Sequence, residues 1–342
     1  MFRAALICSV LCLSALAAMP ATAAPRRGSY GARLGAHSMI YLNSTPADQE
    51  LAFRLTAAAG LRFLRMDFAV GQVFPRGAED FAAVDRVNAL AARYGVEVLG
   101  VITTTPWYIA ACPGGAKDHL ERCAPAPQHG ATWRRMVAKI AQHAANVRFW
   151  ELGNEPDIGF GFNGPPADYA RWAGLAAEGI RAARADARIA IAGFARLDAG
   201  YIMGALHDRA HPLIRSIDIA SIHVRGTLRG VRARLARALE LYRGAGFTGP
   251  LWVTETGYPS RPEHQSQAGF QRGPRDQARW LRRALRSLVD RGAGAVFVTL
   301  RDNPEFGAAN PFSSEGIVSW PGGRGKPAYR AVRRLAAKLR SK

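Results

Sequence analysis

Two glutamates, Glu155 and Glu255, lie at the ends of apolar stretches that share one pattern. Glu155 belongs to FWELGNEPD (149–157), where an apolar run breaks at glycine, asparagine and proline, and Glu255 to LWVTETGYP (251–259). Each stretch predicts a buried strand that ends in a carboxyl group. Hydrolysis of a glycosidic bond with retention needs such a pair, one as acid/base and one as nucleophile, about 5–5.5 Å apart. Each glutamate could instead cap a helix or pair with an arginine, but both together favour catalysis.

The segments around these glutamates alternate between apolar strands and amphipathic helices, which is typical of a parallel sheet covered by helices. Eight such units in 342 residues predict an α/β fold, a single-domain (β/α)8 TIM barrel. An open doubly wound sheet is the alternative, but no glycine-rich phosphate loop follows the first strand. The predicted strands are 34–42, 61–69, 96–104, the run before Glu155, 188–194, 217–223, the run before Glu255 and 293–300. The predicted helices are 45–59, 81–94, one around Trp133, 168–185, 199–207, 230–243, 275–291 and 328–338.

In a barrel of this kind the active site lies at the carboxyl ends of the strands. Glu155 ends the fourth strand and Glu255 the seventh, so the fold would bring them together. Trp150 and Trp252 each stand an odd number of positions from a glutamate, so strand alternation predicts that both face the helices.

The N-terminus has the order of a secretory signal peptide. Arg3 precedes an apolar stretch (4–19) and small residues near position 22, which predicts a signal peptide over 1–23 and a catalytic domain over 24–342. An uncleaved anchor is the alternative, but the stretch is short for a membrane span. The expected location is secreted or periplasmic, without stable membrane insertion after cleavage. The mature chain keeps only Cys112 and Cys123, which fits one disulfide in an exported protein.

The formal net charge of +20 comes from arginines spread over most predicted helices. One interpretation is a solvated surface, and the other is attraction to an acidic polysaccharide or an anionic cell surface. No nucleic-acid motif is present, so we expect no nucleic-acid partner. The eight histidines show no zinc spacing, so we expect no metal and no cofactor.

Four stretches, LRFLRMDFAV, VFPRGAEDF, RFWELGNEPD and LWVTETGYP, make the chain resemble clan A glycoside hydrolases. The resemblance is closest to family-39-type and related family-5-type retaining enzymes and covers essentially the whole mature chain. It implies that Glu155 is the acid/base, that Glu255 is the nucleophile, and that Asn154 binds the sugar 2-hydroxyl. It further implies that Arg65 keeps the nucleophile ionised and that His223 is the strand-six histidine, although His223 could be a satisfied core residue.

The chain departs from that pattern at two places. Val224 and Arg225 follow the strand-six histidine where many relatives have a tyrosine, and the eighth strand ends without the tryptophan that often lies under the sugar. Trp107 and Trp320 are candidate sugar platforms, with ordinary packing as the alternative. Asp67 and His37 stand at strand ends and are expected to line the cleft.

The sequence therefore predicts a secreted retaining glycosidase acting on a polysaccharide or oligosaccharide, with an acidic polymer as one candidate substrate. The alternatives are a non-catalytic carbohydrate-binding protein on the same barrel and a basic envelope or nucleic-acid-binding protein.

Overall fold

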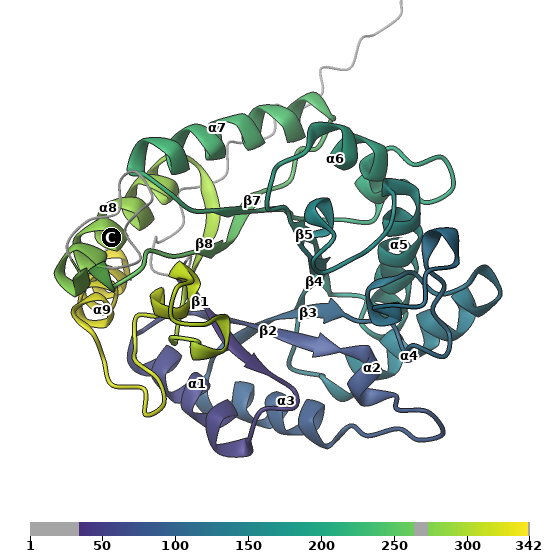
Figure 1. The fold of residues 1–342 in the computed structure, drawn as a ribbon, viewed down its shortest axis with the longest axis horizontal. Helices are drawn as coiled ribbons and strands as arrows, with labels where there is room; N and C mark the ends of the chain where they lie inside the picture. The colour runs from purple at the N-terminus through teal and green to yellow at the C-terminus, as the bar shows by residue number, and fades with distance from the viewer. Residues whose placement is uncertain (1–33, 263–272, 341–342) are drawn as a thin grey trace, which may run out of the picture.

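Eight parallel strands form a barrel in the computed structural model, which describes residues 34–262 and 273–340 (Figure 1). The sheet runs in the order β5-β4-β3-β2-β1-β8-β7-β6, and two bridges between β5 and β6 close it, Ala190 to Ile219 and Phe194 to Ile222. The predicted signal peptide lies outside the described residues. The strands are β1 (Leu34–Tyr41), β2 (Phe63–Ala69), β3 (Glu97–Thr103), β4 (Phe149–Asn154), β5 (Arg188–Gly193), β6 (Ala220–Val224), β7 (Leu251–Thr256) and β8 (Ala293–Thr299).

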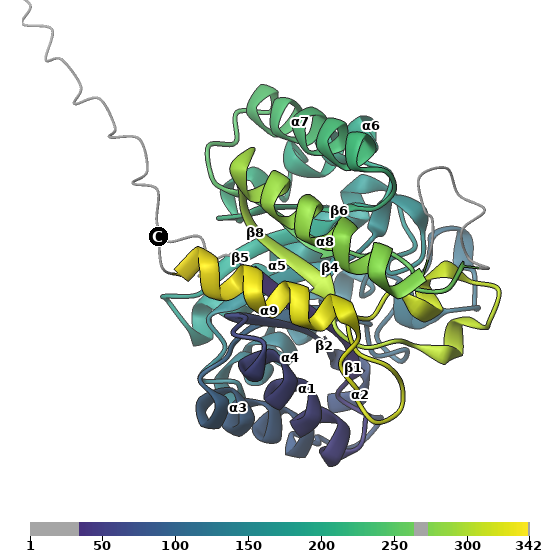
Figure 2. The ribbon, with the colours of Figure 1, turned by 90° about the vertical axis from the view of Figure 1, so that its left-hand side faces the viewer.

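Helices form the outer wall of the barrel, and two of them, α8 and α9, lie side by side on it (Figure 2). Local sequence fixes several helix ends. The Thr45 side chain accepts a hydrogen bond from the Asp48 amide at the start of α1, and Gly95 ends α3 in the left-handed conformation, with φ of 60°. The helices are α1 (Pro46–Ala58), α2 (Val70–Val73), α3 (Ala82–Tyr94), α4 (Gly130–His143), α5 (Pro166–Ala183), α6 (Ala199–Leu206), α7 (Leu228–Gly244), α8 (Gly273–Asp290) and α9 (Pro327–Arg340).

The barrel interior has an apolar floor below a charged layer. The ring of Trp252 lies 5.3 Å from that of Phe63 and 5.9 Å from that of Phe297, so its neighbours come from strands around the barrel. The prediction that Trp252 faces the helices is therefore wrong. Strand β7 carries one extra residue, Thr254, between the register pairs Ile222–Val253 and His223–Glu255, and this extra residue reverses the alternation. Trp150 is buried in the outer core, as predicted.

A disulfide joins Cys112 to Cys123 in the long loop after β3, as predicted. The two Cα atoms lie 5.1 Å apart, and the bridge closes a short loop on the side of the barrel where the strands end. Within the described ranges, no helix combines the length and the apolar character needed to cross a membrane.

Candidate active site

Glu255 lies at the end of β7, where two arginines hold its two carboxylate oxygens. Arg65 Nη1 donates to Glu255 Oε1 at 2.8 Å, and Arg225 Nη2 donates to Glu255 Oε2 at 2.8 Å. Arg65 comes from β2 and is 1% exposed, and Arg225 follows β6. His37 Nδ1 lies 3.5 Å from Glu255 Oε1. The sequence-based expectation that Arg65 lies beside this carboxylate is confirmed.

The charges around Glu255 set its ionisation. Burial alone would raise the pKa of this carboxyl, but its neighbours, in the order His223, His37, Arg65 and Arg225, hold the pKa well below its usual range. Burial lowers the pKa of His37 to about 3, so this imidazole is neutral and faces Glu255 without a charge. Glu255 is therefore a carboxylate over the whole range in which proteins usually work.

Arg65 links Glu255 to two other side chains. Its Nε donates to Glu151 Oε2 at 2.5 Å, and its Nη2 donates to Asn154 Oδ1 at 2.8 Å. Glu151 has no exposed surface and also accepts a hydrogen bond from Thr254 at 2.8 Å. A buried arginine with carboxylates on two sides cannot rotate without leaving a charge unpaired. Arg65 is therefore fixed in place and in turn orients Asn154.

Glu155 is held at the tip of β4 by an irregular backbone. Gly153 has φ of 91° and Glu155 itself has φ of 45°, a conformation that residues with a Cβ rarely adopt. The Glu155 amide donates to the Gly193 carbonyl at 3.1 Å. Two residues later, the Asp157 carboxylate accepts hydrogen bonds from the backbone amides that follow β5, those of Ala195, Arg196 and Leu197. The tip is thus tied to the neighbouring strand.

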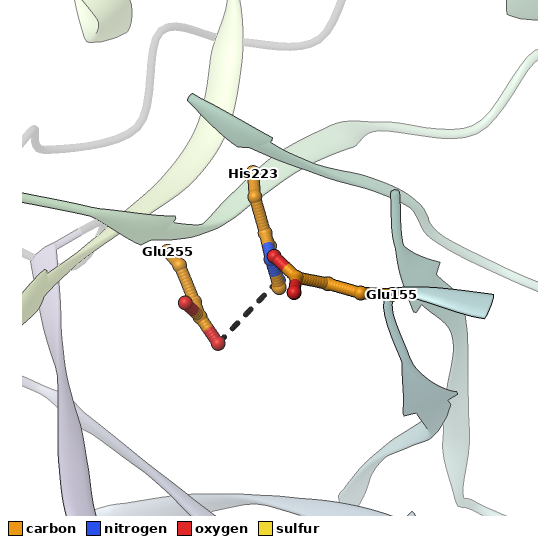
Figure 3. Close-up of side chains that lie close together, drawn as sticks. All are labelled: Glu155, His223 and Glu255. Carbon is orange, nitrogen blue, oxygen red and sulfur yellow. Dashed lines mark hydrogen bonds and ion pairs between the residues drawn. The ribbon is translucent and has the colours of Figure 1, made fainter. Parts of the chain in front are cut away.

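His223, on β6, lies between the two glutamates (Figure 3). Its Nδ1 is hydrogen-bonded to Glu155 Oε1 at 2.7 Å, and its Nε2 lies 3.7 Å from Glu255 Oε1. The ring passes close over Gly193, where any Cβ would collide with it. Ligand atoms of Glu155, His223 and Glu255 all lie within 4.8 Å of one another. His223 is thus buried at the site and not merely satisfied in the core.

A pocket of about 460 Å³ opens above these groups. Apolar side chains form two of its walls: Ile158 and Phe160 after β4, and Phe306 and Phe312 after β8. The other lining residues are polar, apart from the tyrosine ring, and include His37 and Asp67, as predicted; they are His37, Tyr41, Arg65, Asp67, Asn154, Glu155, Arg225, Glu255, Asn303, Glu305 and Asn310.

Asp67 is the lining carboxyl whose ionisation is most affected by its position. Burial raises the pKa of Asp67 to about 6, although Arg65 next to it favours the charged form. Within the described part of the chain, no hydrogen bond or ion pair reaches this carboxyl group. Asp67 therefore titrates in the pH range in which Glu255 stays ionised.

Trp107 and Trp320 are exposed but do not line this pocket. Trp107 is 53% exposed and lies beside Arg76, whose guanidinium is 5.4 Å from the ring centroid. Trp320 is 43% exposed and stacks with Arg301 at 3.9 Å. Their role as sugar platforms stays a prediction for more distant parts of a substrate.

Sequence reasoning missed three charged residues of this site. Glu151 carried a signal, since a glutamate inside an apolar strand four residues before Glu155 must face the barrel interior. Arg225 is the second residue after His223, at a place where the sequence departs from the family pattern that it resembles. Arg225 Nε also donates to Glu315 at 3.0 Å. Glu315 is buried in the loop after β8, and no sequence pattern predicts its contact with Arg225.

The donor set of Glu155, His223 and Glu255 could in principle hold a metal ion. However, Arg65 and Arg225 already place two positive charges on Glu255, and these charges would repel a cation at the same carboxylate. The arrangement suits a buried acid–base pair better than a metal centre.

No protein-family model matches the sequence, and no curated protein matches it either. Solved structures do share the barrel. One is a family 39 glycoside hydrolase from the gut symbiont Bacteroides cellulosilyticus WH2, with a TM-score of 0.64 and 18% identity; the match covers 91% of this chain and 65% of that one. A second is an exo-β-1,4-mannosidase from Opitutaceae bacterium strain TAV5, with a TM-score of 0.66 and 19% identity; the match covers 90% and 60%.

A third is GH5_18 from Streptomyces cattleya in complex with GlcNAc, with a TM-score of 0.63 and 16% identity; the match covers 91% of this chain and 80% of that one. The chain spans less than two thirds of the length of the first two structures. At these identities the similarity describes the fold, and the chemistry must be argued from the side chains of this chain.

Proposed function

We propose that this protein is a secreted glycoside hydrolase that cleaves O-glycosidic bonds in a polysaccharide or oligosaccharide with retention of configuration. The observation that carries the proposal is the pairing of Glu155 with Glu255. An oxygen of each carboxyl group lies within 4.8 Å of the other, at the carboxyl ends of β4 and β7. Retaining enzymes place the two groups about 5–5.5 Å apart, whereas inverting enzymes leave about 6.5–9.5 Å for a water molecule.

Glu255 suits the nucleophile. Two guanidinium groups keep it ionised and fix both of its oxygens, so one oxygen can approach the anomeric carbon without reorganisation. Attack forms a covalent glycosyl–enzyme ester as the bond to the leaving oxygen breaks.

Glu155 suits the acid/base. It would protonate the leaving oxygen in the first step, and as a carboxylate it would take a proton from the attacking water in the second. The hydrogen bond with His223 and the anchored tip of β4 hold Glu155, whereas Arg65 and Arg225 bind the oxygens of Glu255. The two carboxyl groups therefore have different surroundings, as two different roles require.

Asn154 suits recognition of the sugar 2-hydroxyl. Its Oδ1 accepts from Arg65, so its amide nitrogen is directed away from Arg65 and is available to donate into the pocket. The apolar walls of Phe160 and Phe312 offer surfaces against which sugar rings could pack. The disulfide between Cys112 and Cys123 supports export.

A glycan panel with two variants tests the proposal. The mature protein should hydrolyse at least one glycan, and Glu255→Gln should reduce kcat by at least about 10⁴-fold. Glu178→Gln, on the exposed face of α5, is the matched control and should keep full activity. Proton NMR of the first-formed product should show the anomeric configuration of the substrate. Inverted product, or activity that survives Glu255→Gln, would rule out the proposed mechanism.

A further inference from the structure

A groove on the outside of the barrel collects basic side chains from two helices. It lies between α8 and α9, has a volume of about 790 Å³, and is larger than the pocket above the glutamates. The two helices run side by side on the wall of the barrel (Figure 2). We call this hollow the basic groove and define it by its charged lining: Arg275, Arg279, Arg282, Arg283, Arg286, Arg330, Arg334 and Lys338.

The spacing of these residues places them in two rows. On α8, positions 275, 279, 282 and 286 are three or four apart, and on α9, positions 330, 334 and 338 are four apart. Residues at these spacings share one face of a helix. The α8 row spans about 16 Å at the helical rise of 1.5 Å per residue. Both rows line the same groove, so the positive charge extends along the groove and is not confined to one position.

Most of these arginines have no carboxylate partner among the described residues. Within residues 34–262 and 273–340, no carboxylate pairs with Arg282, Arg283, Arg286, Arg330 or Arg334, whereas Arg279 pairs with Asp276. Exposed arginines elsewhere are of both kinds: Arg62 pairs with Glu97, whereas no carboxylate of the described residues pairs with Arg135 or Arg209. The groove thus brings together five arginines that no carboxylate of the described residues neutralises.

The chemistry of the groove favours one class of polyanion. The exposed large apolar side chains of the described residues are Trp107, Ile158, Phe160, Phe312 and Trp320, and none of them lies on α8 or α9. A helix that binds in a membrane surface needs exposed apolar anchors, and a single-stranded nucleic-acid site needs rings for base stacking. The groove therefore suits an extended polyanion whose binding needs neither apolar anchors nor base stacking.

We propose that the basic groove is a secondary binding site for an acidic, carboxylated polysaccharide. The choice of a glycan rests on the proposed function, whereas the binding of a polyanion does not. Helix α8 follows β7 in the chain, and α9 follows β8 after a segment whose Asn310 and Phe312 line the catalytic pocket. Both helices therefore begin on the catalytic side of the barrel, and a chain in the groove would lead toward that side.

Calorimetric titration with sodium alginate tests this site, with neutral dextran as the reference polymer. The triple variant Arg282→Gln/Arg286→Gln/Arg334→Gln removes three groove charges. The matched control, Arg54→Gln/Arg135→Gln/Arg209→Gln, removes three exposed charges from elsewhere on the surface. At about 50 mM salt, the wild type should bind alginate and not dextran, and binding should weaken at about 200 mM salt. The groove variant should lose at least about tenfold in affinity, and the control less than about threefold.

The outcomes separate the alternatives. Equal losses in the two triple variants, or no alginate binding by the wild type, would overturn the groove as a site. Tighter groove-dependent binding of phosphatidylglycerol vesicles or double-stranded DNA would overturn the choice of a polysaccharide. Thermal unfolding of each variant checks that it is folded. If no glycan is hydrolysed but alginate binding still depends on the groove, the proposed function fails and the groove site stands.

Discussion

Arginine occupies two opposite settings in this protein, the pocket and the basic groove. In the pocket, Arg65 is buried and each terminal nitrogen of its guanidinium meets a defined acceptor. In the basic groove, Arg282, Arg286 and Arg334 are exposed and have no carboxylate partner among the described residues. The same side chain therefore experiences low dielectric and fixed geometry in one region, and water and mobility in the other.

The difference shows that a buried charge fixes the geometry of a site, whereas an exposed charge attracts a ligand from a distance. Removing one partner of a buried ion pair leaves an uncompensated charge, so its effect is large and local. An exposed charge acts over a distance, and salt screens it beyond about 8–10 Å. We therefore expect pocket substitutions to be severe and little affected by salt, and groove substitutions to be mild and strongly affected by salt.

After the loss of the nucleophile in Glu255→Gln, the largest effect should come from Glu155→Ala. Loss of the general acid should lower kcat/KM by about 10²–10⁴-fold on substrates with poor leaving groups. Activated aryl glycosides should keep much of their glycosylation rate, because their leaving groups need no proton, and azide should restore turnover by replacing water in the second step. Steady-state kinetics with both substrate types measures this. Equal losses on both types, without azide rescue, would contradict the role of Glu155.

Arg225→Gln should have the next largest effect. Glu255 Oε2 would lose a charge-assisted hydrogen bond, which is typically worth about 1.5–3 kcal/mol, so kcat/KM should fall by about 10- to 150-fold. The pKa of Glu255 should rise toward its ordinary value, so the acid limb of the pH profile should move to higher pH.

A positioning role for Arg225 is tested with two further variants. Arg225→Lys keeps the charge and should retain the pH profile better than Arg225→Gln does. The double variant Arg225→Gln/Glu315→Gln also removes the buried carboxylate that Arg225→Gln would leave without its arginine. This variant should therefore be more stable than Arg225→Gln but no more active. An unchanged acid limb in Arg225→Gln would mean that Arg225 does not act through Glu255.

Asp67 offers a smaller test of the pocket, through stability. Its folded pKa of about 6 exceeds the ordinary 3.8, so the folded state holds the proton more tightly and loses stability as pH rises through this range. Asp67→Asn removes this titration. Because the side chain is partly exposed, its stability relative to wild type should increase by only about 1–2 kcal/mol between about pH 4 and pH 7. Urea unfolding at several pH values measures this, and a pH-independent difference would refute the assignment.

The smallest effect should be on the turnover of an acidic polymer. Raising salt from about 50 to 200 mM should reduce kcat/KM on such a polymer several-fold and leave a neutral fragment nearly unchanged. The groove triple variant should show little of this salt dependence, while the surface control keeps it. If kcat/KM on the acidic polymer and on the neutral fragment responds equally to salt in the wild type, the basic groove does not contribute to turnover.

The sequence alone predicted the barrel because each unit has strong local signals. Apolar strands alternate with amphipathic helices, and Thr45 and Gly95 mark helix ends that the structure confirms. The convergence of Glu155 and Glu255 followed from the barrel, since strand ends meet on one side whatever the details of packing. The contact between Arg65 and Glu255 was predicted from the family resemblance, and Arg65 Nη1 lies 2.8 Å from Glu255 Oε1.

The remaining features depend on contacts that no local pattern encodes. The inward position of Trp252 requires the extra residue in β7, which becomes visible only in the register with β6. The Arg225–Glu315 pair joins residues ninety positions apart, one in a loop after β6 and one after β8. The walls formed by Phe160 and Phe312 belong to irregular loops, for which periodicity gives no signal.

The like charges within the rows of the basic groove have a consequence for the evolution of this chain. Arg282 and Arg286, like Arg330 and Arg334, are like charges four residues apart, a spacing that costs isolated helices about 0.2–0.5 kcal/mol per pair. Selection for folding alone would replace them readily, because exposed helix positions accept most residues. The outer wall therefore retains repulsion between like charges that the fold does not need. Neutral substitutions there should give a protein with a higher melting temperature. The lower melting temperature of the native protein is then a cost of binding the acidic polysaccharide in the groove.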